Sequence, residues 1–381
     1  MGVTNLDFDD IHPFYDKEIL SKFVDRVMEN CKSSQLGLLR LPFSNKQVKR
    51  ESVSSWIDKA VRLNVSEIDM QVLSFELPIS LFTCKTLTKL RINPGNPTYR
   101  VWECPCPVNL PCLKTLDIAV RHNPFVNVFE LIRGCPILES LSLEVFIQME
   151  EEEDYIFNIP TLKRLKLIVQ KVYSSVTKKV VLNVPNLDYL FVGGMLGSLF
   201  VMEDLSSLVE ASTSFRCLWS DGMWLEFLKG ISGVKSLSIK KFPFNSALPI
   251  FPHVRHLQLT SLWYSRLVIE FLESCPELKH LCIEEVLSCF RALMTFFCER
   301  WIKPKWIPSC LLTNLTTIKI SSCKGGRPEM KFLEYMLGNA KVLKTVTITC
   351  EIYPMKEENW LRAKLLKLSR ISRYCEIRFV K

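Results

Sequence analysis

One short pattern of apolar positions recurs along the chain. The form Pro-x-Leu-x-x-Leu-x-Leu, with Val or Ile replacing some leucines, occurs at residues 111–118, 136–143, 160–167, 185–192, 252–259 and 276–283. Looser copies without the proline begin at Leu36, Val65, Leu87, Val234, Leu315 and Leu343. The last two apolar side chains of each copy are two residues apart, so they point to the same face of an extended strand. Proline has no amide hydrogen to donate, which suits the start of a strand. Each copy therefore predicts one short strand.

The copies are regularly spaced, and most of them begin 20 to 29 residues after the previous one. This period is typical of leucine-rich repeats. The longest step, from Leu187 to Val234, leaves room for one degenerate copy around residues 205–208. Between the copies, apolar segments such as 129–134 and 269–274 predict helical returns that end before the next Cys-Pro. Because one strand and one return cannot bury an apolar face alone, we expect stacked repeats. The predicted fold class is α/β: a leucine-rich-repeat solenoid with a curved parallel sheet inside and helical returns outside.

The residues that alternate with the buried leucines face the other way and line the concave side of the predicted sheet, where a target protein would bind. The candidate partner-binding residues are Lys89, Arg91, Thr115, Asp117, Arg164, Lys166, Tyr189, Phe191, His256, Gln258 and His280. Tyr189 and Phe191 are the strongest anchors, because exposed aromatic side chains dominate interface energetics. The alternative interpretation is that a neighbouring return partly buries both rings, which would then not serve as anchors. His256 and His280 occupy equivalent positions in adjacent repeats, so we expect them to be neighbours, either as exposed polar residues or as a pH-sensitive contact.

The sequence contains none of the motifs that carry common enzymatic chemistry. It has no P-loop, no Gly-x-Ser-x-Gly and no His-Glu-x-x-His. Its 15 cysteines are spread along the chain, as expected for reduced, buried thiols. The nearest cluster, Cys104, Cys106 and Cys112 with His122, lacks the second ligand pair of a zinc site. We therefore expect no catalytic residues, no cofactor and no metal, and not an enzyme.

Charge is concentrated at the C-terminal end. The net charge is +9, and residues 301–381 contain 16 Lys and Arg but only 6 Glu. There, Leu361, Leu365 and Leu368 form one stripe, which predicts a terminal helix that caps the last repeat. The alternative is binding of nucleic acid or of an acidic partner. The longest uncharged stretch, 189–202, is too short to span a membrane, and no signal peptide is visible. We expect an intracellular protein, cytoplasmic or nuclear, without a membrane partner.

Four further parts of the chain form a recognisable set. Three of them are the phrase Asn5-Leu-Asp-Phe8, residues 23–27 with 56–69, and residues 77–87. The fourth and most specific is at the end of the chain, at Trp306, Pro308, Cys310, Leu311, Gly326, Glu329, Tyr335 and residues 339–344. Together they resemble plant F-box/leucine-rich-repeat proteins that carry a C-terminal FBD domain, in which a phrase similar to Asn5-Leu-Asp-Phe8 directly follows the F-box. The resemblance implies an N-terminal cap at residues 1–30, a leucine-rich-repeat solenoid at 31–300 and an FBD-like αβ cap at 301–381.

The resemblance also implies a function. The chain resembles the substrate-recognition part of an SCF-type ubiquitin ligase receptor, a non-catalytic interaction module that binds a target protein on its concave repeat face. Since only three residues precede Thr4-Asn-Leu-Asp, we expect the F-box to be absent. A Skp-type adaptor and a cullin are then partners only if an F-box is supplied elsewhere. The alternatives are an F-box-less competitor, a degenerate family member without a ligase role, or binding of an acidic partner through the basic C-terminus; a nucleic acid is the less expected partner.

Overall fold

The protein divides into two compact units, which are described separately. The computed structural model describes residues 5–8, 17–31, 33–41, 48–71, 77–93, 107–121, 125–147, 154–171, 179–195, 199–215, 221–240, 248–260, 265–284, 301, 303–323, 325–350 and 355–380. The N-terminal unit contains residues 1–198 and 203–206, and the C-terminal unit contains residues 199–202 and 207–381. The predicted domain limits at residues 30 and 300 stay predictions.

The N-terminal unit is built on a parallel sheet with one strand per repeat. Its strands follow one another in chain order: β1 (Asn5–Asp7), β2 (Leu38–Leu41), β3 (Glu67–Gln71), β4 (Lys89–Asn93), β5 (Thr115–Arg121), β6 (Ser140–Ile147), β8 (Arg164–Lys171) and β10 (Tyr189–Met195). Adjacent strands pair in parallel and without slippage, for example Thr115 with Ser140 and Ser140 with Arg164. The predicted parallel sheet is therefore confirmed.

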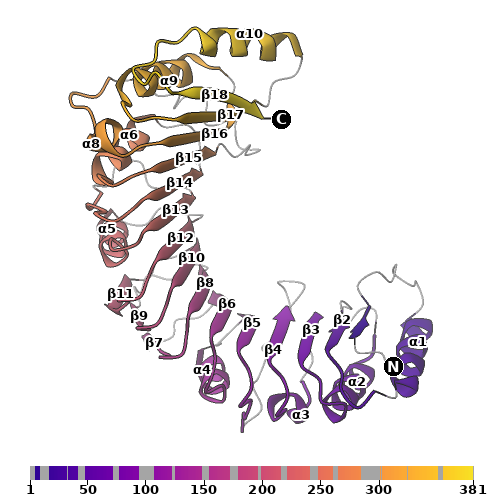
Figure 1. Ribbon diagram of the computed structural model, residues 1–381. Coiled ribbons are helices and arrows are strands. Elements are labelled where there is room, and N and C mark those ends of the chain that lie inside the picture. Colours follow the sequence, from indigo (N-terminus) through magenta and orange to yellow (C-terminus); the bar gives the residue numbers. More distant parts are fainter. Residues whose placement is uncertain are drawn as a thin grey trace. The chain divides into compact units, whose positions relative to one another are not determined.

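The returns of the N-terminal unit are partly different from the prediction. Its helices are α1 (Lys17–Asn30), α2 (Arg50–Arg62), α3 (Ile79–Phe82) and α4 (Phe125–Arg133). The last three lie on the same side of the sheet (Figure 1). However, the returns after β6 and β8 are strands, β7 (Tyr155–Asn158) and β9 (Lys179–Asn183), which pair in parallel. Both segments alternate buried and solvent-facing side chains with a period of two, which fits a strand and not a helix. The predicted helical returns are therefore replaced by strands after β6 and β8.

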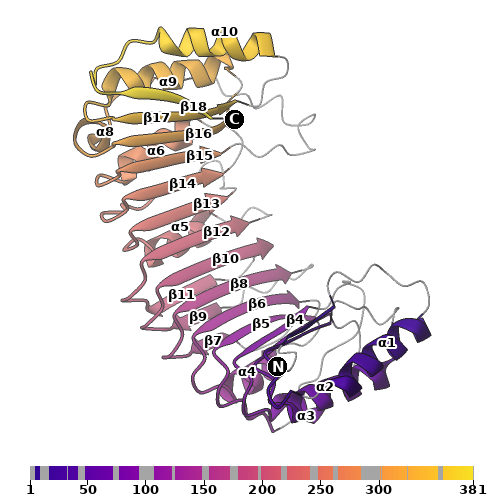
Figure 2. The ribbon, with the colours of Figure 1, turned by 45° about the vertical axis from the view of Figure 1, so that its right-hand side comes forward.

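The C-terminal unit continues the same plan. Its parallel strands are β12 (Glu210–Phe215), β13 (Ser236–Lys240), β14 (His256–Thr260), β15 (His280–Glu284), β16 (Thr317–Cys323), β17 (Thr345–Cys350) and β18 (Glu376–Val380). Its helices are α5 (Asp221–Gly230), α6 (Ser265–Ser274), α8 (Ser309–Thr313), α9 (Arg327–Asn339) and α10 (Met355–Leu366). Strands β13 to β15 lie in front of α5 and α6 in Figure 2. Strand β11 (Leu199–Asp204) lies where the chain passes between the two units.

The core lies between each sheet and its returns, and the repeated apolar positions fill it. Leu113, Leu116 and Ile118 of one copy are fully or almost fully buried, and the first residue of each of the twelve copies is buried as well. Buried Leu and Ile side chains each stabilise the fold by about 1.5–3 kcal/mol relative to exposure. Because one face of every strand is buried, a slip of one residue would expose the whole apolar set, and this fixes the register of the strands.

A chain of backbone hydrogen bonds joins the repeats just before each strand begins. The amide of Lys114 donates to the carbonyl of Thr88, and Glu139 donates to Lys114, both at 2.9 Å. Lys163 donates to Glu139 and Asp188 donates to Lys163, both at 2.8 Å. These residues directly follow the first leucine of each copy, so one residue of every repeat occupies the same place in a row across the sheet.

Side chains at the position before the first leucine reinforce these contacts. Asn186 Nδ2 donates to the Pro160 carbonyl at 2.8 Å, and Asn314 Nδ2 donates to the Pro276 carbonyl at 3.0 Å. Threonine at this position reaches a carbonyl two residues further along the preceding repeat, as in the bond of 2.7 Å from Thr161 Oγ1 to Leu138. A net bond of this kind contributes about 1 kcal/mol. The repeats are thus tied together at their turns by side chains that reach the preceding repeat.

The last helices close the C-terminal end of the repeat stack. Helix α9 buries the side chains of Phe332, Leu333 and Met336, and α10 lies beside α9 in both ribbon views (Figures 1 and 2). Leu361 and Leu365 of α10 are fully buried. The predicted FBD-type αβ cap is confirmed, although Leu368 lies beyond the end of α10 and is only half-buried.

The uncharged segment 189–202 contributes β10 and β11 to the fold. None of the helices in the described ranges is long and apolar enough to cross a bilayer. The intracellular location stays a prediction.

Strand β12 fills the long step in the repeat pattern, as the sequence predicted. Leu208 is the first apolar residue of this copy, but the next two positions hold Ala211 and Thr213, which are both fully buried. The Thr213 hydroxyl has no hydrogen-bond partner among the described residues. A buried hydroxyl without a partner destabilises the fold. The copy is hard to recognise in the sequence because Ala211 and Thr213 replace its two later leucines.

We predict that Thr213→Val raises the free energy of unfolding by about 1 kcal/mol, because valine has the same shape without the unsatisfied hydroxyl. Chemical denaturation of the whole chain measures the change. Thr86→Val is the matched control, since Thr86 Oγ1 donates to the Val65 carbonyl at 2.9 Å. That variant should lose about 1 kcal/mol. A loss of stability in both variants would contradict the assignment of Thr213.

Candidate interaction surface

The face of each sheet that carries no described return is called the open face. In the N-terminal unit, its side chains stand two and four residues after the first apolar residue of each copy. Strand register aligns them in two rows. The first row is Asn5, Leu38, Glu67, Lys89, Thr115, Ser140, Arg164 and Tyr189. The second row is Asp7, Arg40, Asp69, Arg91, Asp117, Ser142, Lys166 and Phe191. All eight candidate residues of this unit lie in these two rows.

The second row begins with five charges of alternating sign, here called the ion ladder: Asp7, Arg40, Asp69, Arg91 and Asp117. Arg40 lies 2.7 Å from an Asp7 oxygen and 3.3 Å from an Asp69 oxygen. Arg91 lies 3.8 Å from Asp69 and 3.2 Å from Asp117. Opposite charges in register on neighbouring strands stabilise a sheet. The candidates Arg91 and Asp117 are therefore already paired within the molecule.

The first row is neutralised over the same strands. Lys89 Nζ lies 3.3 Å from a Glu67 oxygen, and both side chains are about half exposed. Thr115, on the next strand, is half-buried. The candidates on β4 and β5 thus form a flat surface whose charges largely cancel.

Over β8 and β10, the open face carries cations and aromatic rings in place of the paired charges of the preceding strands. The Arg164 guanidinium lies 4.3 Å from the centre of the Tyr189 ring, and Lys166 pairs in register with Phe191. Arg164 and Lys166 are exposed, whereas Tyr189 and Phe191 are half-buried. Lys166 has no carboxylate partner among the described residues. Here two cations and two aromatic rings stand together, and no acid of the described ranges forms an ion pair with either cation.

The candidates of the C-terminal unit are His256, Gln258 and His280. The two histidines are in register on β14 and β15, and their rings stack with centres 4.5 Å apart, so they are neighbours as predicted. His280 Nδ1 also hydrogen-bonds the Thr317 hydroxyl at 2.7 Å. Burial, followed by the nearby charges of His256 and Lys279, lowers the pKa of His280. Gln258 is half-buried and donates to Glu284 at 3.3 Å.

Sequence reasoning missed the acidic and basic partners of the candidates. Asp69 and Arg40 stand four residues after Val65 and Leu36, which is the same offset that selected Arg91 from Leu87. Applying that offset to every copy would have found the ion ladder from Arg40 to Asp117, but not Asp7, which lies before the first copy. Partial burial of Tyr189 and Phe191 was the alternative drawn from the sequence, and both side chains are half-buried, although this face carries no described return.

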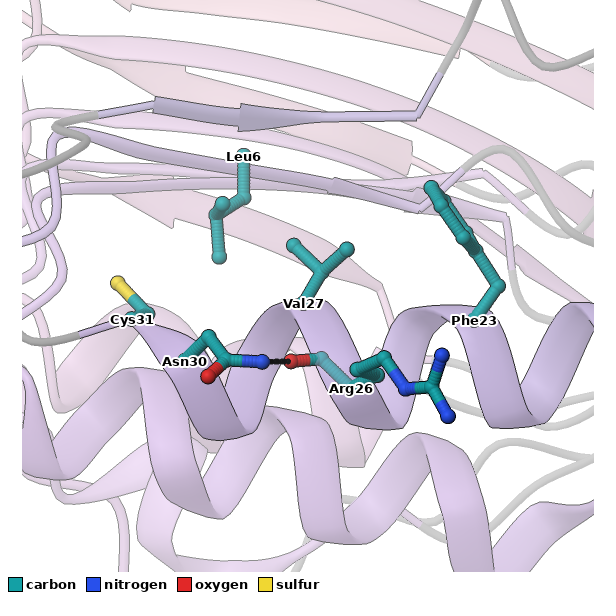
Figure 3. A pocket seen from close by; sticks show the side chains of 6 residues that line it. All are labelled: Leu6, Phe23, Arg26, Val27, Asn30 and Cys31. Carbon is teal, nitrogen blue, oxygen red and sulfur yellow. Dashed lines mark hydrogen bonds between the residues drawn. The ribbon is translucent and has the colours of Figure 1, made fainter.

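A small groove of about 360 Å³ lies at the end of the N-terminal unit, between α1 and β1 (Figure 3). Phe23 and Val27 point from α1 toward the sheet, and Leu6 points toward them from β1. The remaining lining residues are Arg26, Asn30 and Cys31. The six side chains around this groove contain no acid and base that could share a proton.

The described thiols and ligand-type side chains do not suggest reactive chemistry. Within the described ranges, no group of three His, Cys, Asp or Glu residues could hold a metal ion. Cys104, Cys106 and His122 lie outside those ranges. Cys275 and Cys310 are free and buried, and burial raises the pKa of Cys310 to about 12. Such a thiol is protonated at neutral pH and is a poor nucleophile.

The parallel strands follow one another in chain order, one for each copy of the leucine pattern, and helices cover the C-terminal end. This arrangement is typical of leucine-rich-repeat proteins. Comparison with known families narrows this class. The FBD family matches residues 303–348, and the family described as "FBD-associated F-box protein At5g56370, LRR repeats" matches residues 53–202. The FBD match includes α8, β16 and α9.

The chain is also similar along nearly its whole length to curated proteins of Arabidopsis thaliana. It is 29% identical to the F-box/LRR-repeat protein At3g59200, over 99% of this chain and 81% of that protein. It is 27% identical to the putative F-box/FBD/LRR-repeat protein At5g22670, over 99% of this chain and 88% of that protein. The resemblance to plant F-box/FBD/leucine-rich-repeat proteins is confirmed.

We predict that Asp69→Asn lowers the free energy of unfolding by about 1 kcal/mol at low salt, because Arg40 and Arg91 lose the carboxylate between them. The loss should shrink at 1 M salt, where screening weakens the ladder. Glu226→Gln is the control, since the Glu226–Lys229 pair is more than half exposed. Denaturation at two salt concentrations measures both variants. Equal, salt-independent effects would contradict a stabilising ladder.

Stability should also fall when the pH decreases below about 6.5. The folded protein holds the pKa of His280 below its ordinary value of 6.5, so the unfolded chain binds this proton more tightly. The stability contributed by neutral His280 is therefore complete above pH 6.5 and is lost as the pH falls toward the lowered pKa. Titration of His280 by NMR and denaturation between pH 5 and pH 8 test this. His256→Gln removes one cause of the shift and should raise the pKa of His280; an unchanged or lower value would argue against it.

Proposed function

We propose that the protein is a non-catalytic interaction module that binds a target protein on the open face of its repeats, as the substrate-recognition part of an SCF-type ubiquitin ligase receptor. The observation that carries this proposal is the group of Arg164, Lys166, Tyr189 and Phe191 on β8 and β10. It joins two exposed cations and two half-exposed aromatic rings on a face without described returns.

The energetics favour this group over the rest of the open face. Tyr and Arg are enriched among the residues that dominate binding energy, and rigid aromatic rings lose little entropy on binding. Arg164 is held in place by its contact with the Tyr189 ring, so its guanidinium is ordered before a partner arrives. On β3 to β5, in contrast, a partner would have to displace existing ion pairs. The ion ladder therefore stabilises the sheet beside the binding site, while side chains of β8 and β10 provide most of the binding energy.

The role in ubiquitin transfer rests on the relatives. Their printed names describe F-box/LRR-repeat and F-box/FBD/LRR-repeat proteins. In the family that the sequence resembles, the F-box docks the Skp-type adaptor, whereas the repeats select the target. We propose that the repeats bind the target by themselves, so that target binding by the 381-residue chain does not require an adaptor or a cullin.

A non-catalytic role also agrees with the chemistry of the described residues. The groove at α1 has no acid–base pair, and the Cys310 thiol is buried and protonated. The titratable residues of the open face of the N-terminal unit are mostly occupied in ion pairs. These features support binding over catalysis.

Site-specific photo-crosslinking tests the surface. We predict that a photo-crosslinking amino acid in place of Lys166 captures one protein from an Arabidopsis extract, because Lys166 lies among the anchors. The same amino acid in place of Arg133, an exposed residue of α4, should not capture it. Capture at position 133 and not at 166 would overturn the assignment of the open face.

Affinity measurements with the captured protein then test the anchors. The variant Lys166→Ala/Tyr189→Ala/Phe191→Ala should bind at least tenfold more weakly, which corresponds to about 1.4 kcal/mol. The control Glu67→Ala/Lys89→Ala removes an ion pair from the same face and should change the affinity less than threefold. Equal losses in both variants would argue against anchors on β8 and β10.

A further inference from the structure

A second feature of the repeats concerns the residue that directly follows the first apolar position of each copy. In the C-terminal unit, from β13 to β17, these residues are Lys235, Arg255, Lys279, Thr316 and Lys344, and each stands immediately before its strand. The copy at β12 holds the uncharged Val209 at this position. The row crosses the sheet at the tails of these strands, which Figure 2 draws one after another.

Backbone hydrogen bonds hold these residues in line. Arg255 donates its amide to the Lys235 carbonyl at 2.8 Å, and Lys279 donates to Arg255 at 3.0 Å. Thr316 then donates to Lys279 at 2.9 Å, and Lys344 donates to Thr316 at 2.8 Å. Neighbouring parallel strands are about 4.8 Å apart. The five positions therefore form a straight row of about 19 Å, which we call the cationic row.

The cationic row has no neutralising partners in the described part of the chain. Lys235, Arg255 and Lys344 are exposed and Lys279 is half-buried, but no described carboxylate lies within ion-pair distance of any of the four. Glu277 is exposed on the same turn as Lys279 without pairing to it. The charge of Lys279 is one of the causes that lower the pKa of His280.

The N-terminal unit shows what the same position does when it is neutralised. There the row contains Lys114, Glu139, Lys163 and Asp188, whose charges alternate in sign. Lys163 Nζ lies 2.8 Å from one Glu139 oxygen, and Lys114 Nζ lies 4.0 Å from the other. Alternating charges stabilise adjacent strands, whereas like charges in register destabilise them. Lys235, Arg255 and Lys279 stand directly before three consecutive strands, so the C-terminal unit retains a repulsion that an anionic ligand would relieve.

We propose that the cationic row is a docking site for an extended, Asp- and Glu-rich segment of a partner protein, which crosses the strand ends of β13 to β17. The proposal rests on the proposed function of the protein as a binding module and adds the chemistry of a partner segment. An extended chain rises about 3.3 Å per residue, so about six residues span the row.

The surroundings of the row favour an acidic peptide over a nucleic acid. The neighbouring open-face positions hold Ser236 and Thr345, whose hydroxyls are suitable donors to carboxylates. Nucleic-acid single strands are generally held by aromatic rings on which the bases stack. The described residues of the row and its open-face neighbours offer the stacked rings of His256 and His280 only, and these already face each other.

Peptide binding to the full chain tests the proposal. The probes are hexaglutamate, hexaglutamine and a six-nucleotide single-stranded DNA, each measured at 50 mM and 200 mM salt. We expect hexaglutamate to bind, to weaken at higher salt because the contacts are screened, and to bind more tightly than the other two probes. Absence of hexaglutamate binding at 50 mM salt, or tighter binding of the DNA, would overturn the proposal.

Two matched double variants locate the binding. Arg255→Gln/Lys279→Gln should weaken hexaglutamate binding at least tenfold and raise the melting temperature, because it removes the repulsion. Lys114→Gln/Lys163→Gln changes the same repeat position in the N-terminal unit; it should leave peptide binding unchanged and lower the melting temperature, because it breaks ion pairs. Equal peptide affinities in the two variants would overturn the site.

A third variant should increase the affinity of the chain for hexaglutamate. Thr316→Lys fills the uncharged position of the row at the loss of one hydrogen bond, from Thr316 Oγ1 to the Lys279 carbonyl. This variant should bind hexaglutamate more tightly than the unmodified chain, and weaker binding would contradict the row. Failure of these experiments would not affect photo-crosslinking at position 166, so the two proposals are tested separately.

Discussion

The structure depends on the register that the backbone imposes just before each strand. One amide per repeat, such as that of Lys114 or Arg255, donates to the equivalent residue of the preceding repeat. The buried leucines then fix which face of each strand is hidden, because a slip of one residue would expose them. As a result, a position in the repeat becomes a straight row across the sheet, and the composition of each row determines its chemistry.

The rows differ in charge, although their geometry is the same. Where opposite signs alternate, as in the ion ladder from Asp7 to Asp117, the surface is neutral and the charges stabilise the strands. Where one sign is repeated, or where cations stand beside aromatic rings as on β8 and β10, the surface keeps its charge available to a partner. A repeat protein can thus assign stability and binding to different rows without changing its fold, since each substitution at an outward position leaves the buried pattern intact.

Much of the fold follows from the sequence, because the repeated leucines are spaced for one strand per repeat. The rows on the open face also follow, since His256 and His280 were expected to be neighbours and are stacked. The position of the copy at β12 was predicted only approximately, because alanine and threonine replace its later leucines. The strand returns β7 and β9 were missed, because short apolar segments do not distinguish a helix from a strand without their burial. The pairing of Arg91 and Asp117 was missed as well, although the two residues carry opposite charges at the same position of adjacent copies.

The central claim is that a target binds the open face and not the helical side. Hydroxyl-radical footprinting of the chain, free and bound to its captured target, measures this directly. We predict that oxidation of Tyr189 and Phe191 falls in the complex, while oxidation of Ile156, an exposed residue of the return strand β7, does not change. Protection of Ile156 with unchanged oxidation of Tyr189 and Phe191 would contradict the account.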